Sequence, residues 1–132
     1  MTTYAKTALQ AVKLYYSKAA GNPSAAWKMA AEICVPTLEG REKGCPKGAF
    51  LGLCEEGWVV DVPSGNYTKS KLNKNYAVQA VRLLRSNPHL ANDVATLWGE
   101  VMRGGDDESK RHNQQMDVVV ALWNAKLIAR RD

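Results

Sequence analysis

The amino-acid sequence predicts an all-α domain of about six helices, and three observations support this fold class. In long stretches, apolar residues recur at the three- and four-residue spacing of one helical face. Proline, glycine and asparagine residues separate these stretches, as they do at helix ends. The chain has 132 residues, of which 45% are hydrophobic, so it can bury one core. We therefore expect a single domain that spans residues 1–132.

Each expected helix is bounded by residues that start or end helices. Gly21 ends the first helix, and Pro23 begins the second. Pro46 suits the first turn of the third helix and Gly57 its C-terminal cap, while Pro88 breaks the fourth. The expected helices span residues 3–20, about 24–35, 46–57, about 70–86, about 91–103 and about 112–128.

Residues 58–68 are the one segment with β character. Trp58, Val60 and Val62 alternate with the residues between them, which is typical of a short strand. The sequence Pro-Ser-Gly follows at 63–65 and predicts a turn. The largest β element that the sequence predicts is therefore one small hairpin at 58–68.

The order of elements occurs twice along the chain. The segments QAVKLYYS (10–17) and QAVRLLRS (79–86) share five of eight residues. Each precedes a proline-containing break, a short helix with a tryptophan, a loop of mixed charge and a further helix. These features predict an internal duplication, with halves 3–62 and 70–128 related by a pseudo-twofold axis. The starts of the third and sixth helices would then occupy corresponding positions.

The charge and the N-terminus restrict the class of protein. The net charge of +5 permits contact with anions or nucleic acid, but Lys and Arg are spread through the loops rather than gathered in one cluster. No apolar run approaches the roughly 18 residues that span a bilayer, and the N-terminus lacks the charged start and apolar core of a signal peptide. We therefore expect a cytoplasmic protein with reduced thiols and no membrane partner.

The three cysteines predict neither a metal site nor a disulfide. Cysteine and histidine residues form no closely spaced pair of the kind found in zinc sites, so we expect no metal and no cofactor. Cys45 and Cys54 are nine residues apart, which on one helix separates them by about 13 Å, beyond the reach of a disulfide. Cys54 shares the apolar face of its helix with Phe50 and Leu53, so we expect it in the core.

Cys45 has a different setting, because it stands at the expected N-cap of the third helix. Lys43, Lys47 and the helix dipole would stabilise a thiolate there. A nucleophilic cysteine also needs a base, and the predicted duplication places His112 at the corresponding helix start. The same helix start suits an anion, because its free N–H groups lie beside lysines and Gly48 lets a ligand approach the backbone. An ordinary solvated helix cap explains the same residues.

A polar cluster at the start of the last helix is compatible with nucleic-acid recognition. Asn and Gln side chains in the first turn of a helix can bond base edges, and neighbouring cations can contact phosphates. Against this interpretation, acidic residues crowd the same region, and we expect the corresponding third helix to expose Glu55 and Glu56. A capped helix is the alternative. The nucleic-acid candidates are Lys110, Arg111, Asn113, Gln114 and Gln115.

Four segments of the chain are distinctive. They are GCPKGAFLGLCEEG (44–57), GNYTKSKLNKNYA (65–77), LWGEVM (97–102) and HNQQMDVVVALW (112–123). With them the chain resembles, from about Tyr4 to Ile128, a family of small uncharacterised bacterial proteins known only as a domain of unknown function. The resemblance implies a bacterial cytoplasmic protein and carries no known activity, substrate or cofactor. Where the family pattern has a glycine before the final Leu-Ile, this chain has Lys126.

The leading functional prediction is a non-catalytic binding or adaptor module, because polar, turn-forming segments occur in both halves while no catalytic constellation is complete. Its partner would be an unknown protein or an anionic ligand. Two alternatives stay open: helix-turn-helix-like nucleic-acid binding, and a thiol- or anion-dependent enzyme that uses Cys45 with His112. We favour a protein without enzymatic activity over the enzyme alternative. The candidate ligand-binding residues are Lys43, Cys45, Lys47, Gly48, Asn66, Tyr67, His112 and Asn113.

Overall fold

A computed structural model describes residues 1–103 and 114–130 of the chain. The described residues form an all-α fold, as predicted, with six helices of ten or more residues. None of these helices is long and apolar enough to cross a membrane. The elements are α1 (Thr3–Tyr16), α2 (Pro23–Cys34), α3 (Leu38–Arg41), α4 (Gly44–Glu55), α5 (Lys71–Ser86), the 3-10 helix η1 (Pro88–Asn92), α6 (Val94–Arg103) and α7 (Gln115–Asn124).

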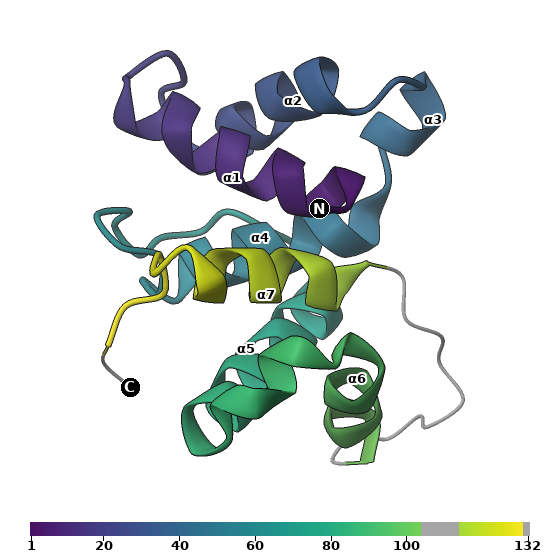
Figure 1. The fold of residues 1–132 in the computed structure, drawn as a ribbon. Helices are drawn as coiled ribbons and strands as arrows, with labels where there is room; N and C mark the ends of the chain where they lie inside the picture. Colours follow the sequence, from purple (N-terminus) through teal and green to yellow (C-terminus); the bar gives the residue numbers. More distant parts are fainter. Residues whose placement is uncertain (104–113, 131–132) are drawn as a thin grey trace.

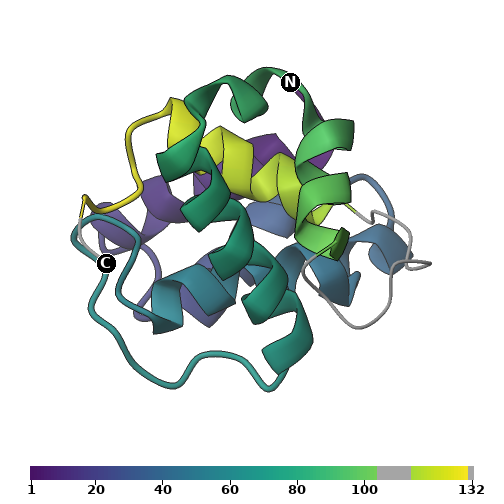
Figure 2. The same cartoon turned by 90° about the horizontal axis from the view of Figure 1, so that it is seen from below.

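The helices stack in three layers (Figure 1). The first layer holds α1 and α2, the middle layer α4 and α7, and the third α5 and α6. Seen from below, α5 crosses both α4 and α7 (Figure 2). Because the middle layer is covered on two sides, its helices are apolar around most of their circumference. Accordingly, Phe50, Leu53, Val118, Val119 and Leu122 are at most 1% exposed.

Short polar side chains start three of the helices. Thr2, Asn22 and Thr37 each accept a hydrogen bond from a backbone N–H in the first turn of α1, α2 and α3, at 3.3, 2.8 and 3.1 Å. These N–H groups have no partner within their own helix, so each cap satisfies a donor that would otherwise depend on water.

Three helices end at a residue in the left-handed conformation. Gly57 follows α4 with φ 76°, which confirms the predicted cap. Lys18 and Lys126 follow α1 and α7 with φ of 66° and 62°. Lys18 therefore ends α1 at Tyr16, earlier than the predicted residue 20. At both lysine positions glycine would adopt the same backbone with less steric strain.

The predicted hairpin at 58–68 is wrong. Val59 instead forms an isolated antiparallel bridge with Ile128, beyond the end of α7. The Val60 N–H donates to the Leu127 carbonyl and the Ala129 N–H donates to the Trp58 carbonyl, each at 2.8 Å. The alternation at 58–62 therefore reflects an extended segment, but its partner is the C-terminal segment rather than its own sequence neighbour.

The helix order of the two predicted halves is observed, because α1, α2 and α4 precede α5, α6 and α7. The first half contains the additional helix α3, and the second contains η1. The pseudo-twofold relation between the halves stays a prediction.

Two glycines bring α4 and α5 into close contact. A Cβ atom on Gly52 would lie 2.6 Å from both the Cα and the Cβ atom of Lys74. Gly48, one turn earlier, faces the same helix. The four-residue spacing of these glycines is typical of close helix packing. Because neither glycine has a side chain, α5 lies directly against the middle layer.

Candidate functional site

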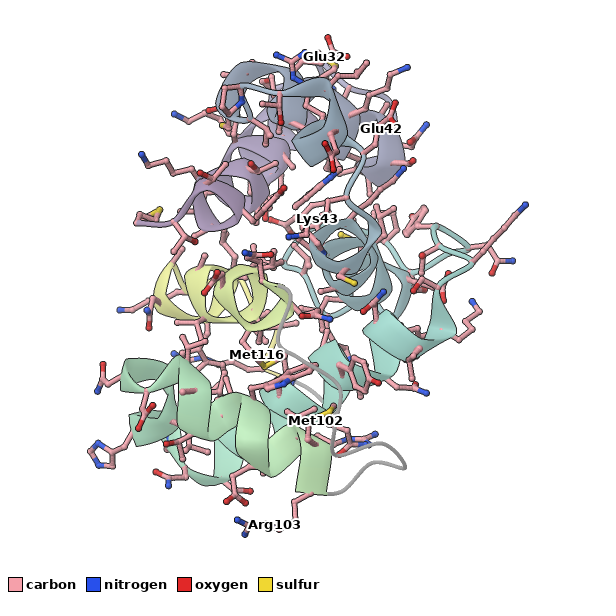
Figure 3. All side chains as sticks on the ribbon, turned by 90° about the vertical axis from the view of Figure 1, so that its right-hand side faces the viewer. Glu32, Glu42, Lys43, Met102, Arg103 and Met116 are labelled. Atoms are coloured by element: carbon pink, nitrogen blue, oxygen red, sulfur yellow. The ribbon has the colours of Figure 1, made fainter. Side chains whose placement is uncertain are left out.

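The starts of the third and sixth long helices lie side by side. Lys43 is the N-cap residue of α4 and Gln114 that of α7. The Lys43 Nζ atom donates a hydrogen bond of 2.8 Å to Gln114 Oε1 and lies 5.8 Å from the ring centroid of Tyr4. Figure 3 shows this side of the molecule, with Lys43 between α1 and α7. The lysine thus joins the N-terminal helix to the last one.

A buried amide network continues from the start of α7 to the start of α5. Gln115 is fully buried, and its Nε2 atom donates to Asn73 Oδ1 at 3.1 Å. Asn73 Nδ2 in turn donates to Ser70 Oγ at 2.8 Å. Buried amides cost free energy unless they are hydrogen-bonded, so this network allows polar residues in the core. We call Lys43, Gln114, Gln115, Asn73 and Ser70 the helix-start junction.

The side chains of α5 fill the space predicted for a ligand at Gly48. A Cβ atom on this buried glycine would lie 2.9 Å from Asn73 Cβ and 3.2 Å from Ser70 Cβ. The expectation that Gly48 admits a ligand is therefore wrong, because its missing side chain admits α5. Cys45 and Lys47 are half-buried in the first turn of α4, and the N-cap is Lys43 rather than Cys45.

The nucleic-acid candidates divide into two groups. Gln115 is fully buried and bonds Asn73, so it does not present its amide to a base. The side-chain oxygen of Gln114 is occupied by Lys43. Lys110, Arg111, His112 and Asn113 lie outside the described residues, and with them the predicted pairing of Cys45 with His112.

Glu55 organises the segment that links the two halves of the chain. Its side chain is only 5% exposed, so the expectation that the third helix exposes this residue is wrong. Glu55 Oε1 accepts hydrogen bonds from the N–H groups of Tyr67 (2.9 Å) and Thr68 (3.2 Å). Glu55 Oε2 accepts from the ammonium groups of Lys71 and Lys74, each at 2.8 Å. These four donors, the Lys71 ammonium foremost, hold the pKa of the carboxyl well below its usual range.

The depressed pKa of Glu55 predicts how stability depends on pH. The carboxylate stabilises the fold above its unfolded pKa of about 4.3, and this stabilisation is lost as pH falls from there toward the folded pKa. We expect the free energy of unfolding to fall more steeply below about pH 5 in the wild type than in Glu55→Gln, which has no proton to gain. Urea unfolding at a series of pH values measures both slopes, and parallel curves would contradict the assignment.

The predicted residues Asn66 and Tyr67 belong to the segment that Glu55 holds. The Tyr67 hydroxyl donates to the Pro63 carbonyl at 2.7 Å, which fixes the preceding turn. Asn66 is exposed. Neither residue belongs to the helix-start junction, so those predicted ligand-binding residues that the structure describes do not lie together in one site.

The cysteines take structural positions. Cys54 is fully buried, as predicted, and burial raises the pKa of its thiol. Cys34 and Cys45 are half-buried, and no disulfide joins any of the three cysteines. Across the described ranges, no group of three or more His, Cys, Asp or Glu side chains is arranged to hold a metal ion.

A pocket of about 540 Å³ opens at the end of α7. Its described lining contains three cationic residues, one tryptophan and no carboxylate. It forms where the C-terminal segment, which pairs with Val59 through Ile128, passes Arg85 in the last turn of α5. We call it the cationic pocket. Its lining residues are Arg85, Trp123, Asn124, Lys126, Ile128, Ala129 and Arg130.

Arg85, which lines the cationic pocket, is held in place by two contacts. Its Nη2 atom donates to the Ala129 carbonyl at 2.8 Å, and its guanidinium lies 4.6 Å from the ring centroid of Trp58. Arg82 approaches the same ring at 5.8 Å. A guanidinium over an indole face is favourable, and the indole helps to fix its position.

Sequence reasoning missed the cationic pocket because its residues come from separate segments. The repeat QAVRLLRS contains Arg82 and Arg85, while Lys126 and Arg130 follow the last helix. The only sequence signal was this excess of cations in the last turns of one helix and after the end of another. Their proximity depends on the bridge at Val59, which local periodicity does not encode.

Comparisons with known proteins place the chain in a family without assigning it a function. The curated proteins contain no match to it, and neither do the solved structures. One family model matches residues 1–129, nearly the whole chain. The chain therefore belongs to DUF6979, a family of unknown function.

Proposed function

We propose that the protein is a non-catalytic binding module that holds a small anionic ligand in the cationic pocket. The observation that carries the proposal is the lining of this pocket, where Lys126 and Arg130 come together and no described lining residue is a carboxylate. Its volume of about 540 Å³ falls in the range of small-molecule sites, which is roughly 300–1,000 Å³.

The two outer cations favour an anion directly. Lys126 and Arg130 are exposed, and neither forms an ion pair with another described residue. An anion would therefore gain charge-assisted hydrogen bonds without breaking an existing pair. Arg130 adds the planar fork that matches phosphate and carboxylate oxygens.

Cations near the ends of helices also have a purely structural explanation. Arg85 lies in the last turn of α5 and Lys126 just beyond α7, where helix dipoles favour positive charge. Arg130 lies beyond the last helix, so the dipoles do not account for it. Lys126 moreover occupies a left-handed backbone position that glycine would fill with less strain. A strained residue at a pocket supports a binding role.

The chemistry of the cationic pocket supports binding rather than catalysis. Among its described lining residues, no carboxylate, imidazole or thiol is present to transfer a proton or attack a substrate. The lysine and arginine side chains there offer hydrogen-bond donors and no acceptor, which suits the binding of an anion.

The variant Lys126→Gly tests the proposal, because it removes the cation and relieves the backbone strain together. We expect pyrophosphate binding, measured by titration calorimetry at low salt, to weaken about tenfold or more. We expect the free energy of unfolding to rise by about 1 kcal/mol, so the lost binding would not reflect a damaged fold.

The control is Lys18→Gly, which makes the same change at the left-handed residue after α1. Lys18 does not line the cationic pocket. The Lys18→Gly variant should therefore gain similar stability and bind pyrophosphate like the wild type. Equal weakening in both variants would show a general charge effect, and no binding by the wild type at low salt would refute the proposed function.

A further inference from the structure

We infer that the anion in the cationic pocket is a phosphate that carries a planar aromatic ring, as in a mononucleotide, and that the ring stacks on Trp123. This inference rests on the proposed function and names the ligand class of the same site. It is carried by the position of one indole beside the cations of the pocket.

Trp123 is the one tryptophan placed to meet a ligand. The other three, Trp27, Trp58 and Trp98, are 1%, 6% and 8% exposed and belong to the core. Trp123 is half-buried and lines the cationic pocket together with Lys126 and Arg130. An indole beside fixed cations is the combination that binds a base and its phosphate, since the ring stacks while the cations neutralise the charge.

The charge and the remaining lining fit such a ligand. A phosphate monoester carries up to two negative charges, and the exposed Lys126 and Arg130 supply two positive ones. The guanidinium of Arg85 is already bonded to the Ala129 carbonyl, so the direct phosphate ligands would be Lys126 and Arg130. The Asn124 side chain also lines the pocket, and its amide offers both a donor and an acceptor to the edge of a ring.

The size of the cationic pocket favours one nucleotide over a longer strand. Its volume of about 540 Å³ suits a single small molecule. The same chemistry, one base beside one phosphate, occurs in a free mononucleotide and at the phosphorylated end of a nucleic-acid strand. The experiment must therefore separate these two sources.

The test compares AMP with ribose 5-phosphate, which has the phosphate and the sugar but no aromatic base. We expect the wild type to bind AMP at least about tenfold more tightly than ribose 5-phosphate. We also expect AMP to quench tryptophan fluorescence. In Trp123→Leu this advantage should disappear, while ribose 5-phosphate keeps its affinity. Trp123→Phe, which retains an aromatic face, should preserve part of the advantage, and circular dichroism confirms that both variants fold.

Different failures have different meanings. Equal affinity of the wild type for AMP and ribose 5-phosphate would overturn the ring inference and leave the proposed anion site standing. Binding of neither phosphate, nor of pyrophosphate, would refute the proposed function as well. An AMP advantage that survives in Trp123→Leu would also overturn the inference, because the ring would then lie elsewhere.

A 5′-phosphorylated single strand of eight nucleotides identifies the source. If this strand binds as tightly as AMP, and only when it carries its terminal phosphate, the result supports the end of a nucleic acid as the ligand. Binding of AMP alone supports a free nucleotide. Binding that grows with strand length and ignores the terminal phosphate would refute a single-nucleotide pocket.

Discussion

Replacing Gly52 by alanine is expected to lower the free energy of unfolding by about 3 kcal/mol, at the upper end of the usual cost of overpacking. The added Cβ atom would lie 2.6 Å from the Cα atom of Lys74. The obstructing atom belongs to the backbone, so no side-chain rotation relieves the clash. Helix α5 must move away from α4. That movement also separates the Lys74 Nζ atom from Glu55 Oε2, which lie 2.8 Å apart.

Urea unfolding measures this effect, and Gly99→Ala in α6 is the matched control. Gly99 is exposed, and a Cβ atom there would meet no other atom within 4 Å. Alanine is the better helix former, so the control should become more stable by about 0.5–1 kcal/mol. If both variants shifted stability in the same direction and by the same amount, the close approach of α4 and α5 would be refuted.

Replacing Glu55 by alanine should have a comparable effect, again about 3 kcal/mol, because it breaks a buried ion pair from one side. The change leaves the ammonium of Lys74, whose side chain is 17% exposed, without its most buried partner. It also removes the acceptor of the Tyr67 and Thr68 N–H groups. Lys71 contributes less to stability than its effect on the pKa of Glu55 suggests, because its side chain is 59% exposed and water screens the pair.

Glu56→Ala is the matched control for Glu55→Ala. Glu56 is the next residue, also pairs with Lys74 at 2.8 Å, but has a side chain that is 40% exposed and holds no backbone N–H group. Its loss should cost at most about 1 kcal/mol. Limited proteolysis adds a second readout, since Glu55→Ala alone should make residues 63–70 more susceptible. Equal costs for the two variants would show that burial of Glu55 does not matter.

Two of the distinctive sequence segments stabilise the packing of the helices. The segment at 44–57 supplies Gly48, Gly52 and Glu55, which meet α5 and the residues before it. The segment at 65–77 supplies the partners of that carboxylate. The proposed anion site lies outside this set of packing residues, so we expect changes in the helix-start junction to affect stability before binding.

Much of the fold follows from the sequence alone. Helical periodicity, the cap at Gly57, the buried Cys54 and the all-α class are local properties, because a residue and its neighbours within one or two turns determine them. The family also follows from the sequence, through segments that stay contiguous along the chain. These predictions are confirmed by the helices, the core and the family match.

The tertiary structure alone decided which distant segments meet. Glu55 looks like a surface residue at a helix end, and only the four donors from 67–74 make its burial favourable. The extended run at 58–62 has no partner in its own neighbourhood and pairs with Ile128 instead. That bridge brings Arg85 close to Ala129 and so forms the cationic pocket. Such contacts depend on how whole helices pack, which the local periodicity of the sequence does not specify.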